Sequence, residues 1–144
     1  MFEPYTFVDT SAWYALLDKS DENHQSAKAL FNSSDSPFIT SNFIIGETLT
    51  LVKNRLGHPI AIEIGSKLWN EEVAKLITID SKIEKVAWEI FQKYMDKGFS
   101  FTDCTSFSLM EQLKIVSAFT FDEHFSQYGK FSVVPPMKSS KRIQ

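Results

Sequence analysis

The sequence contains a single cysteine, Cys104, which excludes an internal disulfide and a metal site built from several thiolates. No apolar run reaches the length needed to span a membrane, and the amino terminus lacks the basic residues and apolar stretch of a signal peptide. Internal repeats and low-complexity segments are also lacking. We therefore expect a cytoplasmic protein with no membrane partner.

The composition is that of one packed domain. The 144 residues are 43% hydrophobic and include 13 Phe and 3 Trp, which predicts a globular core. We expect one domain over residues 1–136 and a basic, flexible tail over residues 137–144. The formal net charge is −3, but setting four metal-binding carboxylates aside leaves +1, so the charge does not exclude a nucleic-acid partner. Basic residues gather in two places: Lys53 with Arg55, and Lys138, Lys141 and Arg142 in the tail.

Strand-like and helix-like segments alternate along the chain. Short β-branched and aromatic runs predict five strands, at residues 5–8, 38–40, 76–79, 117–121 and 131–134. Apolar residues at helical spacing between and beside them predict about seven helices. This alternation is typical of an α/β fold in which helices cover both faces of a mostly parallel sheet.

Three aspartates are expected at one edge of that sheet. Asp9 directly follows the first strand, and Asp122 directly follows the fourth. Asp103 lies in the first turn of a helix for which Thr102 is the expected N-cap, where the helix dipole favours a carboxylate. Ligands of open α/β sheets bind at the carboxyl ends of the strands, so this placement predicts a site.

Glu47 is the fourth candidate. It lies within the predicted helix 43–56, and its neighbours on that helix are apolar, so we expect a buried helix and an acid in an unfavourable place. Gly46 beside it weakens a helix by about 1 kcal/mol relative to alanine, which indicates a close approach by another group. The inward stripe of this helix is predicted to consist of Ile45, Leu49, Val52 and Leu56.

Four carboxylates in one place repel one another unless cations are present. Hard oxygen ligands suit Mg²⁺ or Mn²⁺, and two such ions can activate a water and stabilise the leaving oxygen of a phosphodiester. The histidines at positions 24, 58 and 124 show no spacing typical of paired ligands, and we expect His124 to be a surface residue.

The segments that carry these acids resemble the motifs of PIN domains, the family that contains the VapC-type toxin ribonucleases. They are Val8-Asp9-Thr10-Ser11-Ala12, Glu47 in its apolar helix, the segment 101–107 and the segment 120–125. The resemblance runs from Phe7 to Val134 in the order of the family. It implies a three-layer α/β/α fold with strand order 3-2-1-4-5, and RNA cleavage with one or two Mg²⁺ or Mn²⁺ ions.

The resemblance also implies roles for individual residues. Asp9, Glu47, Asp103 and Asp122 would hold the metal and serve catalysis, and Thr10, Ser11 and Ser106 would orient water or phosphate around them. It further implies a homodimer and, for a toxin, an antitoxin that covers the acidic cleft or a groove beside it. No residue is assigned to substrate binding.

Each acid also has an ordinary structural interpretation. Asp9 and Asp122 could be simple N-caps, Asp103 a partner of the helix dipole, and Glu47 half of a buried salt bridge. Two other functions compete with the nuclease: a PIN fold that binds RNA or protein without turnover, and a phosphatase that forms an aspartyl-phosphate. The four mutually repelling acids argue against the first, and Ser11 stands where the second usually has another aspartate.

Overall fold

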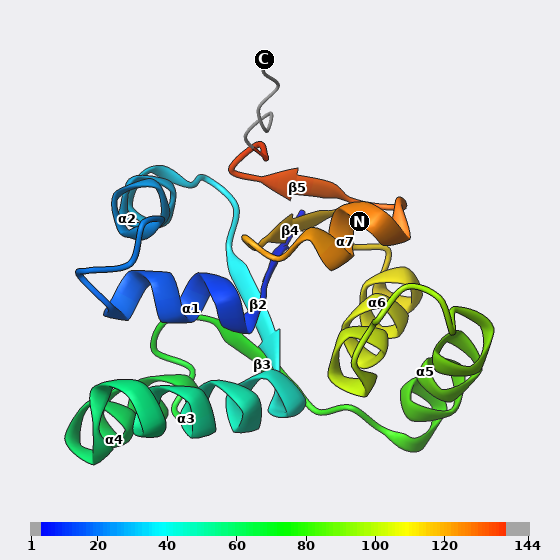
Figure 1. Cartoon of the computed structure of the whole chain (residues 1–144), viewed down its shortest axis with the longest axis horizontal. Coiled ribbons are helices and arrows are strands. Elements are labelled where there is room, and N and C mark those ends of the chain that lie inside the picture. Colours follow the sequence, from blue (N-terminus) through cyan, green and yellow to red (C-terminus); the bar gives the residue numbers. More distant parts are fainter. Residues whose placement is uncertain (1–3, 138–144) are drawn as a thin grey trace.

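The computed structural model describes residues 4–137 as three layers with a parallel sheet in the middle (Figure 1). The strand order is β3-β2-β1-β4-β5, and every neighbouring pair is parallel. This confirms the predicted fold class and strand order. The strands are β1 (Thr6–Val8), β2 (Phe38–Ser41), β3 (Lys75–Ile77), β4 (Ser117–Phe119) and β5 (Ser132–Val134).

Seven helices connect these strands. α1 and α2 join β1 to β2, α3 and α4 join β2 to β3, α5 and α6 join β3 to β4, and α7 joins β4 to β5. Because parallel crossovers are right-handed and the strand order reverses after β3, α1–α4 cover one face and α5–α7 the other. The helices are α1 (Thr10–Leu17), α2 (His24–Ser33), α3 (Asn42–Leu56), α4 (His58–Trp69), α5 (Ser81–Lys93), α6 (Phe101–Leu113) and α7 (Glu123–Tyr128).

Aromatic side chains fill the core on both faces of the sheet. Beneath α1 and α2, Phe38 stacks on Phe31, with ring centroids 5.2 Å apart. On the other face Phe107 of α6 stacks on Tyr128 at 4.3 Å and meets Phe125 edge-on at 5.0 Å. α6 lies between the sheet and α5 (Figure 1), and its residues from Asp103 to Met110 are all buried. The helix that carries Asp103 is therefore packed against its neighbours along most of its length.

Polar side chains mark the helix starts, and the start of α6 differs from the predicted one. The N-cap of α6 is Ser100 and not Thr102: its hydroxyl accepts from the Asp103 amide, while the Asp103 carboxylate accepts from the Ser100 amide. Asp80 caps α5 by accepting from the amide of Ile83. α2 begins at His24, after a turn that Asp21 closes by accepting from the amide of Asn23. At the start of α6 both Ser100 and Thr102 are suitable cap residues, and tertiary packing selects between them.

Several large apolar side chains are exposed. α6 ends at Leu113, and Lys114 adopts a left-handed conformation with φ of 59°, so Val116 lies outside the helix and is 65% exposed. Trp69 is 50% exposed and Phe91 40%. Trp88 lies on the surface of α5 with its ring stacked on Phe91.

Within residues 4–137, no helix combines the length and the apolarity that crossing a membrane requires. The predicted flexible tail lies outside the described residues, apart from Met137.

Candidate active site

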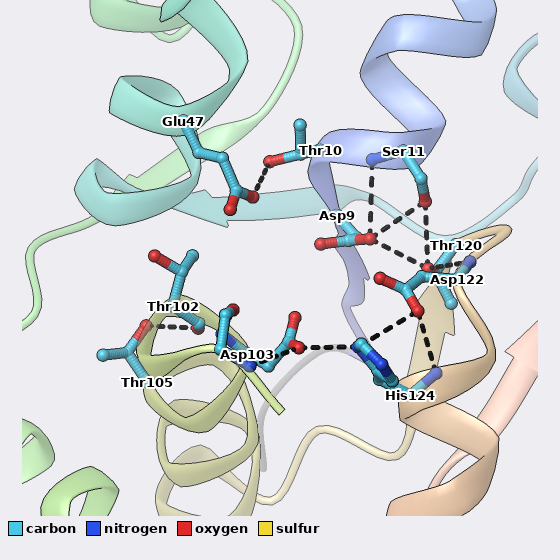
Figure 2. A network of polar contacts seen from close by, with 11 residues as sticks. Asp9, Thr10, Ser11, Glu47, Thr102, Asp103, Thr105, Thr120, Asp122 and His124 are labelled. Carbon is cyan, nitrogen blue, oxygen red and sulfur yellow. Dashed lines mark hydrogen bonds and ion pairs between the residues drawn. The ribbon is translucent and has the colours of Figure 1, made fainter. Parts of the chain in front are cut away.

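All four predicted acids line one pocket at the carboxyl ends of the strands (Figure 2). Its volume is about 380 Å³. The acids come from four separate parts of the chain: the end of β1, the second turn of α3, the first turn of α6 and the start of α7. The lining residues are Asp9, Thr10, Ser11, Glu47, Leu51, Ser100, Asp103, Asp122 and His124.

Asp9 is the most buried of these acids, with 4% of its surface exposed. It caps α1, and its Oδ2 accepts from the hydroxyls of Ser11 and Thr120, each at 2.9 Å. Burial raises the pKa of Asp9 to about 7, against the effect of the two hydroxyls, and the charges of Asp103 and Asp122 add to the rise. The residue is therefore both an N-cap and a member of the acidic cluster.

Thr120 joins the first and last segments of the site. Its Oγ1 donates to Asp9 and accepts from the backbone amide of Asp122 at 3.0 Å. It also lies 3.1 Å from the hydroxyl of Ser11, which in turn accepts from the amide of Phe121. Sequence reasoning missed Thr120, although a threonine at the end of an otherwise apolar strand was an available signal.

His124 is the second missed residue. Its Nδ1 lies 2.8 Å from Oδ2 of Asp103 and 3.3 Å from Oδ1 of Asp122, as Figure 2 shows. The prediction of an unpaired surface histidine is therefore wrong: the side chain is half-buried between two acids of the pocket. The available signal was its spacing, because a residue two positions after Asp122 lies in the same turn of α7.

The Asp103 carboxylate has two contacts, one with a backbone amide and one with an imidazole. Its Oδ2 accepts from the Ser100 amide at 3.0 Å and contacts His124. Burial raises the pKa of Asp103 against the effect of the Ser100 amide, and the nearby Asp122 charge raises it further. Asp122 itself caps α7, with Oδ1 accepting from the amide of His124 at 2.9 Å.

Glu47 faces these residues from the opposite side of the pocket (Figure 2). It is exposed, which contradicts the expected burial, because α3 is inward only along Ile44, Ile45, Thr48 and Val52. Its Oε1 accepts from the hydroxyl of Thr10 at 2.6 Å. The carboxylate group is nevertheless partly withdrawn from water, and this raises its pKa. Among residues 4–137 no lysine or arginine lies within 4 Å of Glu47, so it is not part of a salt bridge there.

Of the three residues expected to support the acids, Thr10 and Ser11 line the pocket and hydrogen-bond to Glu47 and Asp9. Ser106 is not among the lining residues. It is fully buried in α6, and its hydroxyl has no hydrogen-bond partner within the described part of the chain. A role for Ser106 in the site stays a prediction.

The donor set fits a divalent cation. One ligand atom each from Asp103, Asp122 and His124 lie within 4.8 Å of one another. Burial, and to a smaller extent the neighbouring carboxylate charges, raise the pKa values of Asp9, Glu47 and Asp103, and the hydrogen bonds that these groups accept do not offset the rise. A cation would supply that compensation, and the oxygen-rich set suits hard ions.

The PIN domain family matches residues 6–131 of this sequence. Over 129 residues the chain is 36% identical to the 23S rRNA-specific endonuclease VapC20 of Mycobacterium tuberculosis H37Rv, covering 90% of this chain and 98% of that protein. Ribonuclease VapC26 of the same organism is 27% identical, with coverages of 89% and 98%. The chain therefore belongs to the PIN domain family, as its motifs predicted.

Solved structures of related proteins have the same fold. The crystal structure of VapC20 from M. tuberculosis, described as a sarcin–ricin loop cleaving toxin, superposes with a TM-score of 0.84 at 35% identity, covering 89% of this chain and 98% of that one. The DNA-bound VapBC of Salmonella typhimurium superposes at 0.66 with 10% identity, covering 92% and 97% of the two chains. The second comparison shows the shared fold alone. Within the family, the similarity is to VapC-type members.

Proposed function

We propose that this protein is a metal-dependent endoribonuclease of the VapC type. The observation that carries the proposal is the convergence of Asp9, Glu47, Asp103 and Asp122 on one pocket of a PIN fold. Neither capping nor salt bridging explains why four acids from four segments share this place. The 36% identity to an endonuclease over nearly the whole of both chains supports the same activity.

The four carboxylates would hold one or two ions, and Mg²⁺ or Mn²⁺ suits their hard oxygens. Divalent cations bound there would lower the pKa of an attacking water and stabilise the leaving oxygen of the phosphodiester. The protein's own hydrogen bonds orient the carboxylates for this role. Ser11 and Thr120 fix the Asp9 carboxylate through Oδ2, which leaves Oδ1 without a hydrogen bond within residues 4–137 and free to face the pocket.

The same residues make metal binding depend on pH. Asp9 has a pKa of about 7 in the metal-free protein, so a substantial fraction of it is protonated near neutrality. A cation must displace that proton before Asp9 can serve as a ligand, and its binding will therefore release protons. Ser11 and Thr120 then donate to a fully ionised carboxylate, which strengthens both hydrogen bonds.

Ribosomal RNA is the substrate that we propose, on the strength of the name and the similarity of VapC20. We further propose a protein antitoxin as the partner that restrains this activity. A guanidinium group from such a partner would fit among the carboxylates of the pocket.

Cleavage of a sarcin–ricin loop hairpin and of an unrelated hairpin by the purified full chain tests the proposal. Each RNA is incubated with Mg²⁺, with Mn²⁺ or with EDTA. We expect cleavage with metal, none with EDTA, and none by Asp9→Asn or Asp103→Asn. Glu89→Gln is the matched control, because Glu89 is an exposed carboxylate of α5 outside the pocket, and we expect it to cut like the wild type.

Cutting that survives both pocket substitutions would place the chemistry elsewhere or in a contaminant. An absence of cutting, together with tight RNA or protein binding that needs no metal, would support the alternative of a PIN fold that acts as a binding module.

A further inference from the structure

The geometry points to Arg55 as a residue that positions the RNA by binding a backbone phosphate beside the acidic pocket. This inference rests on the proposed ribonuclease function and adds a substrate contact to it. Arg55 is exposed near the end of α3, the helix that also carries Glu47.

The seam between α1 and α3 connects Arg55 to the pocket. At the pocket end, Thr10 of α1 donates to Glu47 of α3 at 2.6 Å. One turn further along α1, the ring of Tyr14 lies under the guanidinium of Arg55, whose Cζ is 5.5 Å from the ring centroid. The two helices run side by side over this stretch (Figure 1).

Leu51 lies midway between Glu47 and Arg55 along α3, four residues from each, and its side chain lines the pocket. Arg55 comes eight positions after Glu47, which corresponds to roughly 12 Å along the helix axis. Arg55 thus lies just beyond the pocket wall that Leu51 forms. An RNA strand that leaves the acids along this seam would reach it.

The guanidinium of Arg55 is held in place but not neutralised. Tyr14 is 8% exposed, and its hydroxyl donates to Oδ2 of Asp18, so the ring beneath the guanidinium is fixed. Asp18 also accepts from Ser20, and its carboxylate does not pair with Arg55. In the described part of the chain no carboxylate lies within 4 Å of the Arg55 nitrogens.

Such a group suits phosphate. A guanidinium presents a planar fork of donors that matches two phosphate oxygens, and a contact with one tyrosine leaves the other donors of that fork free. The pocket itself repels an RNA backbone through its four carboxylates wherever cations do not offset them. A fixed cation at the rim would hold the strand against that repulsion.

Lys53 provides a matched control. It is an exposed cation on the same helix, but two residues from Arg55 correspond to about 200° around the axis, so it points away from the seam. A general attraction between α3 and RNA would involve both residues equally, whereas a specific phosphate contact involves Arg55 alone.

The test measures binding of the hairpin that the full chain prefers, in an Asp103→Asn background that keeps the RNA intact. Arg55→Gln, Arg55→Lys and Lys53→Gln are compared over a series of salt concentrations, after thermal unfolding has shown that each variant folds. We expect Arg55→Gln to weaken binding about tenfold and to reduce the slope of log affinity against log salt by roughly 0.7 to 1. Arg55→Lys should restore part of the affinity, and Lys53→Gln should stay within about twofold of the background protein.

With Asp103 restored, Arg55→Gln should raise KM for cleavage and leave kcat nearly unchanged, because the contact holds substrate in the ground state and the transition state alike. Equal effects of Arg55→Gln and Lys53→Gln, or an effect on kcat alone, would overturn the inference while leaving the nuclease intact. A wild-type protein that neither cuts nor binds any RNA would overturn both.

Discussion

His124 contacts Asp103 across the gap between α7 and α6, with Nδ1 of the ring 2.8 Å from Oδ2 of the carboxylate. The same nitrogen lies 3.3 Å from Asp122, so one imidazole separates two acids that would otherwise face each other directly. The two carboxylates are close enough to share one cation, and the ring is their shared partner when none is bound.

His124→Ala should therefore destabilise the metal-free protein more than the metal-bound one. Removing the ring leaves Asp103 and Asp122 without their shared partner, at a cost of about 1–3 kcal/mol. A divalent cation between the two carboxylates replaces that attraction. We expect the difference in Tm between wild type and variant to be large in EDTA and to shrink in Mn²⁺.

His58→Ala is the control for this comparison, since His58 is exposed at the start of α4 and lies outside the pocket. It should behave alike in both buffers. A His124→Ala deficit of equal size with and without metal would show that the ring does not stand in for a cation.

Without bound metal, the free energy of unfolding should fall as the pH rises, because Asp9 loses its proton. Burial raises the pKa of Asp9 from 3.8 to about 7, so the folded state takes up a proton that the unfolded state has already released. The stabilisation by this proton is fully present below pH 3.8 and is lost as the pH rises through about 7. In EDTA the free energy of unfolding should be higher at about pH 5.5 than at about pH 8.

Asp9→Asn tests this linkage, because the amide stays neutral and its oxygen can still accept from Ser11 and Thr120. We expect the variant to be more stable than the wild type at about pH 8 by roughly 2–4 kcal/mol, with the gain falling toward pH 5. The measurement is urea denaturation in EDTA at several pH values. A gain that does not change with pH would contradict the assignment of the titration to Asp9.

Ser11 and Thr120 should act as a coupled pair. Both hydroxyls donate to the same oxygen of Asp9 and lie 3.1 Å apart. Ser11→Ala and Thr120→Val should each cost about 1–3 kcal/mol of unfolding free energy, and the double variant should depart from their sum by at least about 0.5 kcal/mol. Additivity within about 0.3 kcal/mol would mean that the two hydroxyls act independently.

Ser100→Ala should reduce both stability and RNA cleavage. It removes the cap of α6 at a cost of about 1 kcal/mol, because the Asp103 amide loses the Ser100 hydroxyl as its acceptor, and it changes a side chain that lines the pocket beside Asp103. Asp80→Ala removes the cap of α5 at a similar cost, but Asp80 does not line the pocket. The two variants should unfold at similar urea concentrations, and only Ser100→Ala should lose activity; equal losses would indicate a general effect of stability.

Gly46→Ala should stabilise the protein by about 0.5–1 kcal/mol, because alanine is the better helix former. A Cβ at position 46 would meet no other atom within 4 Å, so no group of the described chain needs the glycine. Gly65→Ala in α4 is the contrasting change, since its Cβ would lie 3.0 Å from a methyl group of Leu49 and should gain less or lose stability. Urea denaturation of both variants decides this.

Three of the four acids could be placed from the sequence because a general rule governs them. Asp9, Asp103 and Asp122 stand at strand ends or a helix start, and the carboxyl ends of parallel strands meet at one edge. Glu47 was placed in the correct helix, but not all of the apolar neighbours that suggested burial cover it. Leu51, for example, is half-buried and lines the pocket.

His124 and Thr120 could not be assigned in the same way. The ring of His124 gains its role only when α7 packs against α6, and Thr120 acquires its partner from a residue 111 positions away. The local signals, a threonine at the strand end and a histidine two positions after Asp122, do not identify these partners. The choice between Ser100 and Thr102 as N-cap is a smaller case of the same kind, because both residue types cap helices well and only the packed structure selects one.

The distance along the chain between Asp9 and Thr120 also bears on when the enzyme becomes active during its own synthesis. Asp9 leaves the ribosome well before its hydrogen-bond partner Thr120 and before Asp122, which follow after 111 and 113 further residues. Because β4 must pair with β1 before these groups meet, a growing chain has no assembled pocket. This protein therefore cannot cut RNA before the segment that carries Thr120 and Asp122 has been synthesised and β4 has paired with β1.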